Sequence, residues 1–125
     1  MAISVKVDKS KVLIRGKGRI TDTHIFIAHK MKVEHADYKP GLPVLCDFTG
    51  VTETSITPFS LKMLADMQLF TPELFQESHM AIIASDEQVY AQAKMFQILT
   101  SELPRKLEVF RKKREAVQWL VGKLV

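Results

Sequence analysis

The chain has 125 residues, of which 46% are hydrophobic and 26% are charged, a composition typical of one folded domain and unlike that of a disordered chain. No apolar run approaches the ~20 residues that a membrane-spanning helix needs. A single cysteine excludes an internal disulfide, so we expect a cytoplasmic protein that folds as one domain over residues 1–125. The net charge is +4, but an acidic middle separates two basic ends and no helix-turn-helix or zinc-finger pattern is present, so we expect no nucleic-acid binding.

The first 40 residues predict two strands and a helix. Apolar residues alternate with polar ones over residues 3–7 and 12–14, which is typical of an antiparallel hairpin, and we interpret RGKGR at 15–19 as the closing turn. Thr21 or Asp22 can cap a helix that runs to about Ala36. Its predicted sheet-facing stripe consists of Ile20, His24, Ile27, Ala28, Met31, His35 and Tyr38. The two histidines would lie ~16 Å apart, too far to hold one metal ion.

The stretch 42–70 contains the predicted central strand, a loop rich in hydroxyl groups and a helix. LPVLCD is an apolar run of the kind found in buried parallel strands, and we expect this strand to end at Asp47. Thr57 followed by Pro58 is a strong helix start, because threonine caps well and proline suits the first helical position. The helix 58–70 is apolar on two sides, with Leu61, Leu64, Ala65 and Leu69 on one and Phe59, Met63, Met67 and Phe70 on the other.

The helix 87–100 repeats this two-sided pattern. It follows an apolar strand at 79–84 and a capping-box pattern of Ser85 and Gln88. Its larger stripe is Val89, Ala93, Phe96, Leu99 and Leu103, and its smaller one is Ala91, Met95 and Ile98. A helix on one face of a sheet needs one stripe, so the second stripes predict contact between the two helices, a homodimer interface or a lipid-like pocket. The interface candidates are Phe59, Met63, Met67, Phe70, Met95 and Ile98.

A last strand at 106–110 and a closing helix at 111–122 complete the chain, and the helix should pack through Ala116, Trp119, Leu120 and Leu124. A short helical turn is expected after Thr71. The order strand, strand, helix, then strand–helix three times predicts an α/β fold. We expect a mixed five-stranded sheet with an N-terminal antiparallel hairpin, repeated β–α crossovers and about four helices.

Several motifs along the chain carry a family resemblance. Residues 47–52 read DFTGVT between an apolar strand and a helix, ASD stands at 84–86, and VFR at 109–111 precedes Trp119 and Leu120. The first motif is similar to the DLSGVT strand end of STAS domains. The others, with the helix bearing Ala93, Met95 and Phe96, resemble the bacterial SpoIIAA-like branch, often labelled STAS/SEC14-like. The resemblance spans nearly the whole chain and implies a cytoplasmic regulatory or binding domain without catalytic activity of its own.

The same resemblance bears on phosphorylation. STAS antagonists carry a phosphorylatable serine in a D-S-S-G loop before the second helix. Aligned through Asp47 and Gly50, the acceptor position is Ile56, so the family's partner-switching phosphorelay is not expected here. Ser55 and Thr57, one residue to either side, are the remaining phospho-site candidates. Thr57 is better explained as the helix cap, because the unpaired N–H groups of the first turn need its hydroxyl.

A ligand site would lie beyond the carboxyl ends of the parallel strands, as in other open α/β sheets. That edge is expected to collect hydroxyl and carboxylate groups from two loops and the cations of residues 111–114. With two helix N-termini nearby, this chemistry suits a phosphate or an anionic head group, although a solvated basic turn also explains the cations. The ligand-binding candidates are Asp47, Thr49, Thr54, Ser55, Ser85, Arg111 and Lys112.

Catalytic motifs are missing from the sequence, which has no P-loop, no HExxH and no GxSxG. Cys46 lies in the apolar strand, where a thiol is usually inert packing. We therefore expect no enzyme, no cofactor and no metal. The leading hypothesis is a regulatory or protein-interaction domain that forms homodimers and binds a protein partner. The alternative is a carrier of a lipid-like or phosphate-bearing ligand, with the Met/Phe stripe as wall and residues 111–114 as anion clamp.

Overall fold

The computed structural model describes residues 2–75 and 78–124, with the backbone alone for 123 and 124. The sheet has five strands in the order β1-β2-β3-β4-β5, and β1 is antiparallel to β2 while all other neighbours are parallel. This is the mixed sheet with an N-terminal hairpin that the sequence predicts. The elements are β1 (Ile3–Val7), β2 (Val12–Ile20), α1 (Asp22–Val33), β3 (Val44–Thr54), α2 (Pro58–Phe70), the short 3-10 helix η1 (Pro72–Phe75), β4 (His79–Ile83), α3 (Glu87–Leu99), β5 (Lys106–Phe110) and α4 (Lys113–Leu124).

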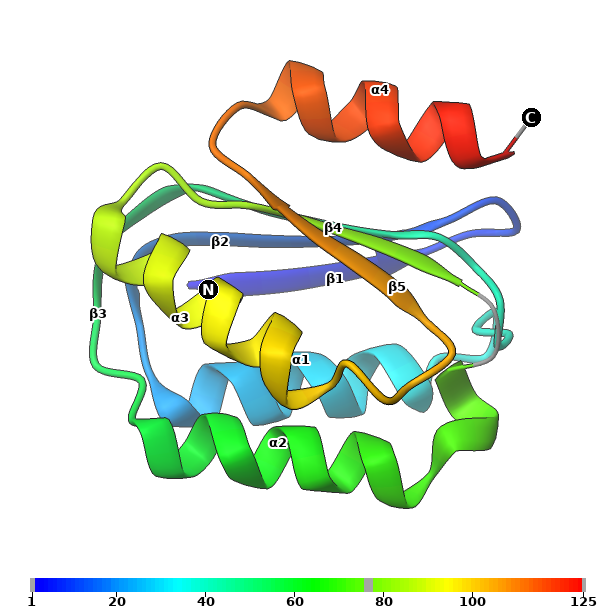
Figure 1. Ribbon diagram of the computed structural model, residues 1–125, viewed down its shortest axis with the longest axis horizontal. Helices are drawn as coiled ribbons and strands as arrows, with labels where there is room; N and C mark the ends of the chain where they lie inside the picture. The colour runs from blue at the N-terminus through cyan, green and yellow to red at the C-terminus, as the bar shows by residue number, and fades with distance from the viewer. Residues whose placement is uncertain (1, 76–77, 125) are drawn as a thin grey trace.

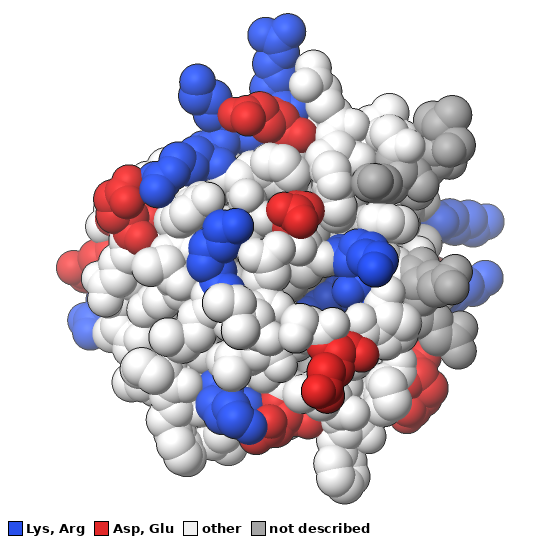
Figure 2. Space-filling model, in the orientation of Figure 1, with Lys and Arg blue, Asp and Glu red and all other residues white. Residues whose placement is uncertain are grey.

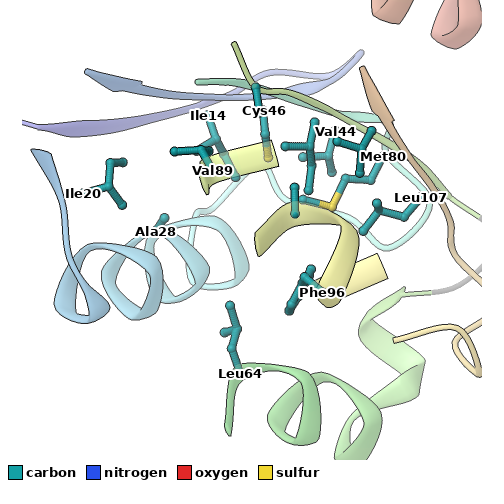
Figure 3. Close-up of a cluster of buried hydrophobic side chains, with 14 of the residues drawn as sticks. Ile14, Ile20, Ala28, Val44, Cys46, Leu64, Met80, Val89, Phe96 and Leu107 are labelled. Atoms are coloured by element: carbon teal, nitrogen blue, oxygen red, sulfur yellow. The ribbon is translucent and has the colours of Figure 1, made fainter. Parts of the chain in front are cut away.

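The sheet separates two unequal layers of helices. Helices α1, α2 and α3 cover one face, and α4 covers the other (Figure 1). Buried side chains of the sheet and of α1–α3 form the larger core, in which Cys46 and Met80 point toward Phe96 of α3 and Leu64 of α2 (Figure 3). A smaller cluster under α4 contains Ala116 and Leu120, with Trp119 packed against it, as predicted. The side chain of Leu124 lies outside the described residues. None of the described helices is long and apolar enough to cross a membrane.

Strands β2 and β3 are longer than the sequence predicts. The stretch 15–19 is the second half of β2, not a turn, and β3 continues past Asp47 to Thr54. The two strands pair in parallel as far as Ile20 with Thr54, with register shifts near the glycines that mark irregular pairing. The hairpin turn is at residues 8–11, between the two strands as predicted, and there the Asp8 carboxylate accepts hydrogen bonds from two backbone N–H groups. Pairing of the backbone groups outweighs the turn-forming tendency of the glycines.

Gly16 shows why a glycine stands in this strand. A Cβ at this position would lie 2.6 Å from Ile20 Cδ1 and 2.9 Å from Phe48 Cδ1, so both side chains would have to shift. The glycine therefore lets the main core close tightly against β2 instead of marking a turn.

Helix α1 is rotated relative to the predicted stripe. Ile20 and Ala28 are in the core as expected, but Met31 is 39% exposed and His35 is exposed. Lys32 takes the core position instead and is only 3% exposed. The prediction was wrong because periodicity rules count lysine as a surface residue, whereas its long aliphatic stem can be buried.

The helix starts follow the predictions in part. Thr57 caps α2 by accepting a hydrogen bond from the backbone N–H of Ser60 at 3.1 Å, as predicted. Helix α3 is capped by Asp86 and not by Ser85, because the Asp86 carboxylate accepts from the N–H groups of both Gln88 and Val89. Helix α4 begins at Lys113, two residues later than expected. Residues 111 and 112 are therefore a connection between β5 and α4, not a helix start.

Candidate binding site

The predicted anion site begins at Asp47, which lies within β3 opposite Ile83, the last residue of β4. Its carboxylate accepts hydrogen bonds from the Thr49 hydroxyl at 2.7 Å and the Thr49 N–H at 3.1 Å, and Lys113 Nζ lies 3.6 Å away. Burial opposes ionisation, but these hydrogen bonds and the Lys113 cation hold the pKa of Asp47 below its ordinary value. Asp47 and Thr49 are thus brought together on the α4 side with Lys113, one of the cations of residues 111–114 that the sequence predicts at this edge.

Thr54, Ser55 and Thr57 lie elsewhere. Thr54 lies seven positions after Asp47 along β3, about 23 Å away in an extended strand. The Thr54 hydroxyl donates to Gln92 Oε1 of α3 at 2.9 Å, and the Thr57 N–H donates to the Asp22 carboxylate at 2.8 Å. The predicted edge therefore divides into two separate groups, because β3 extends beyond Asp47. Ser55 is exposed, and its phosphorylation, like that of Thr57, stays a prediction.

The cations of residues 111–114 do not converge on one point. Arg111 donates two hydrogen bonds to the Glu87 carboxylate, at 2.5 and 3.2 Å, and its guanidinium lies 4.0 Å from the centroid of the Tyr90 ring. Lys113 instead points to Asp47. Ser85 and Lys112 are exposed, with no side-chain partner among the described residues. The Arg111 contact links the β5–α4 connection to α3, and the Lys113 contact links the start of α4 to β3. Both residues therefore have a structural role.

The second stripes of α2 and α3 are exposed. The two helices contact each other, yet the contact leaves all of the interface candidates on the surface. The exposed fractions are 73% for Phe59, 44% for Met63, 43% for Met67, 89% for Phe70, 40% for Met95 and 72% for Ile98. Figure 2 shows that uncharged atoms dominate the surface over α2 and α3, with few charged groups between them. Contact between the helices therefore does not account for the second stripes, and we call these six residues the α2–α3 patch.

A cavity of about 100 Å³ lies in the main core, between the sheet and α1–α3. Its wall consists almost wholly of aliphatic and aromatic side chains from strands β1–β4 and from the three helices. The polar or ionisable exceptions are His29, Lys32, Cys46, Thr54, Gln68 and Gln92. No residue of the α2–α3 patch belongs to this wall, so the patch and the cavity are separate features.

Two buried cations lie at one end of this core. Lys32 Nζ is 4.9 Å from the centroid of the Phe75 ring, and the Arg105 guanidinium carbon is 5.5 Å from the same centroid. Lys32 and Arg105 are 3% and 5% exposed, and no carboxylate among the described residues lies within ion-pair distance of either. Burial lowers the pKa of Lys32 to about 8 and that of Arg105 to about 10. A cation–π contact compensates a buried charge only in part.

Arg105 and the nearby His29 each contain a buried nitrogen that makes no hydrogen bond to the described residues. Arg105 donates to Gln68 Oε1 and to the Thr100 hydroxyl, both at 3.0 Å, but its Nε has no partner among the described residues. His29 Nδ1 is also buried, and residues 2–75 and 78–124 give it no partner. Burial and the charges of Lys32 and Arg105 lower the pKa of His29 to about 4, so the imidazole is neutral at pH 7. We call Lys32, His29, Gln68 and Arg105 the cationic cluster.

Sequence reasoning missed the cationic cluster, although part of the signal was present. Ile25, Ala28 and Lys32 recur at helical spacing, which places Lys32 on the same side as two core residues. Arg105 follows a proline after α3 and carries no periodic signal. Cys46 was predicted correctly as buried, since it is 2% exposed and burial raises the pKa of its thiol to about 12. Among the described residues, no three His, Cys, Asp or Glu side chains gather in a group that could hold a metal ion.

A mixed five-stranded sheet with an antiparallel first pair, three helices on one face and one on the other defines a SpoIIAA-like fold, as the sequence motifs predict. The chain is similar to the solved structure of an uncharacterised protein from the DUF3478 family with a SpoIIAA-like fold, from Shewanella loihica PV-4. The TM-score is 0.57 and the sequence identity is 19%, over 95% of this chain and 92% of that chain, so the likeness shows the fold alone. No family model matches this chain, and neither does any curated protein.

Proposed function

We propose that the protein is a non-enzymatic binding domain that associates with a second copy of itself through the α2–α3 patch. The observation that supports this proposal is the exposure of six large apolar side chains on two neighbouring helices. Complete burial of one such side chain contributes about 1.5–3 kcal/mol, whereas association costs about 4–15 kcal/mol. A single exposed residue is therefore not enough for a stable dimer, whereas burial of six such side chains on each of two copies can exceed this cost.

The charges beside the patch are compatible with a second copy as the occupant. Lys62 and Asp66 lie on α2 one helical turn apart and form an ion pair at 2.5 Å. Because they neutralise each other, two copies of this face can approach without net repulsion. The same face is suited to a protein partner that competes with self-association, which is how a regulatory role would operate. A cytoplasmic location stays a prediction.

Replacing Met67 with lysine tests self-association. Met67 is 43% exposed on α2, so a lysine there should leave the fold intact but place an unpaired cation in the proposed interface. We expect the wild type to sediment as a dimer at micromolar concentration, and Met67→Lys to weaken the dimer at least tenfold. The matched control is Val121→Lys, at a 54% exposed position of α4 on the opposite side of the sheet. A wild type that stays monomeric at high micromolar concentration, or equal behaviour of the two variants, contradicts the proposal.

A small-ligand carrier is the second candidate function, and the apolar cavity is the observation that favours it. The earlier form of this hypothesis, with the Met/Phe stripe as wall and residues 111–114 as clamp, is not supported by the geometry. The stripe does not line the cavity, and Arg111 is bound to Glu87. A ligand would instead occupy the main core and meet the cationic cluster.

A further inference from the structure

We propose that the cavity between the sheet and α1–α3 binds a small organic carboxylate, whose apolar body fills the cavity while its carboxylate meets Lys32 and His29. This inference rests on the carrier function and names the chemical class of its ligand. It is independent of self-association, because the α2–α3 patch does not contribute to the cavity wall.

The size and the wall of the cavity define the apolar part of the ligand. A dry cavity of about 150 Å³ lined by aliphatic and aromatic side chains is large enough to bind benzene. The present cavity, at about 100 Å³, is somewhat smaller and has the same kind of wall. It therefore suits one six-membered ring or a short branched chain, and it is too small for a long acyl chain without a rearrangement of the core.

The charge of the cavity wall defines the polar part of the ligand. Lys32 lines the cavity and is 3% exposed, so its ammonium group has lost nearly all of its contact with water. A buried cation is costly unless an anion and hydrogen bonds compensate it, and the rings of Phe75 and Tyr38 provide only a partial substitute. No carboxylate among the described residues compensates Lys32, and an anionic ligand would do so. A neutral ligand would not reduce the free-energy cost of burying the Lys32 cation.

The donors beside Lys32 favour a carboxylate. His29 is neutral at pH 7, and its buried Nδ1 has no partner in the part of the chain that the structure describes. This nitrogen donates a hydrogen bond in the tautomer that carries its proton there. Gln68 uses Oε1 to accept from Arg105, so the group that it can still offer to a ligand is its amide N–H. The two oxygens of a carboxylate can accept from an ammonium group and from one such neutral donor at the same time. A dianionic phosphate would need more cations at the cavity wall than Lys32 alone.

The test compares benzoate with benzyl alcohol, which share the ring and differ in charge, by isothermal titration of the full chain. The variants are Lys32→Met, which keeps the length and apolar bulk of the side chain, and Lys30→Met, the matched control at an exposed position of the same helix. We expect the wild type and Lys30→Met to bind benzoate at least tenfold more tightly than benzyl alcohol. Lys32→Met should lose this preference, with at least tenfold weaker benzoate binding and benzyl alcohol binding retained.

Two results would overturn the inference, and only the first of them is compatible with the carrier function. If both probes bind equally well and Lys32→Met changes neither affinity, the anion recognition is wrong while the carrier function stands. If neither probe binds the wild type at millimolar concentration, both the carboxylate site and the carrier function are wrong. Self-association is measured separately and is unaffected by either result.

Discussion

Replacing Phe75 with alanine is expected to lower the free energy of unfolding by about 3–5 kcal/mol, the range for large aromatic deletions in well-packed cores. Phe75 is 2% exposed at the end of η1, and its ring lies against both Lys32 and Arg105. It also stacks with the His29 ring, at a centroid distance of 6.1 Å. The substitution removes apolar burial and, at the same time, the surface that partly compensates two buried charges.

Urea denaturation of Phe75→Ala and Phe59→Ala measures this effect with a chemically identical control. Phe59 lies on the α2–α3 patch and is 73% exposed, so its deletion in the monomer should change the free energy of unfolding by less than about 0.5 kcal/mol. The measurement should be made at a protein concentration low enough to keep the chain monomeric. A difference between the two variants of less than about 1 kcal/mol would show that Phe75 does not organise this part of the core.

Replacing Lys32 with methionine is expected to raise the free energy of unfolding at pH 7 by about 1–4 kcal/mol, the range found when buried ion pairs are replaced by apolar residues of similar volume. The reason is that Lys32 is buried, lacks a carboxylate partner among the described residues and has a pKa lowered to about 8. Lys30→Met, on the exposed side of α1, should have almost no effect. A loss of stability in Lys32→Met would contradict the account, because it would mean that the native protein fully compensates this charge.

The pH dependence of this gain follows from the direction of the pKa shift. Between about pH 8 and pH 10.5, the unfolded chain holds a proton on Lys32 that the folded protein has released, so wild-type stability rises with pH in that window. Below pH 8 both states are protonated, and the cost of the buried charge is fully present. The advantage of Lys32→Met should therefore be largest at pH 7 and shrink toward pH 10.5. Burial also lowers the pKa of Arg105 to about 10 and raises the pKa of Tyr38, so Lys30→Met is measured at each pH as the reference.

The sequence predicts the fold correctly where apolar residues are buried and polar residues are exposed. Leu61, Leu64 and Ala65 are both apolar and buried, so the core side of α2 was found correctly. Two of the fold errors, at Lys32 and at Asp47, arose where polar residues lie inside. Asp47 was taken as the end of a strand, but its hydrogen bonds with Thr49 and its proximity to Lys113 allow a carboxylate to remain within β3.

The candidate sites were less predictable than the fold, for the same reason. Grouping Asp47 with Thr54 assumed that β3 ended between them, and the continued pairing of β3 with β2 separates the two residues. The cationic cluster depends on Arg105 and Gln68, which are distant in sequence and meet only in the folded protein. Local patterns contain no information about such a contact. The α2–α3 patch was predictable residue by residue, because a second apolar stripe is visible in the spacing alone.

Hydrogen exchange measured by mass spectrometry at low and high protein concentration tests the central claim, which is that α2 and α3 form the self-association surface. The account predicts that amide protection increases with concentration in Pro58–Phe70 and Glu87–Leu99, while Lys113–Leu124 on the opposite face of the sheet is unchanged. Met67→Lys should abolish the increase. Protection that does not depend on concentration, or that increases in α4 and not in α2 and α3, would contradict the claim.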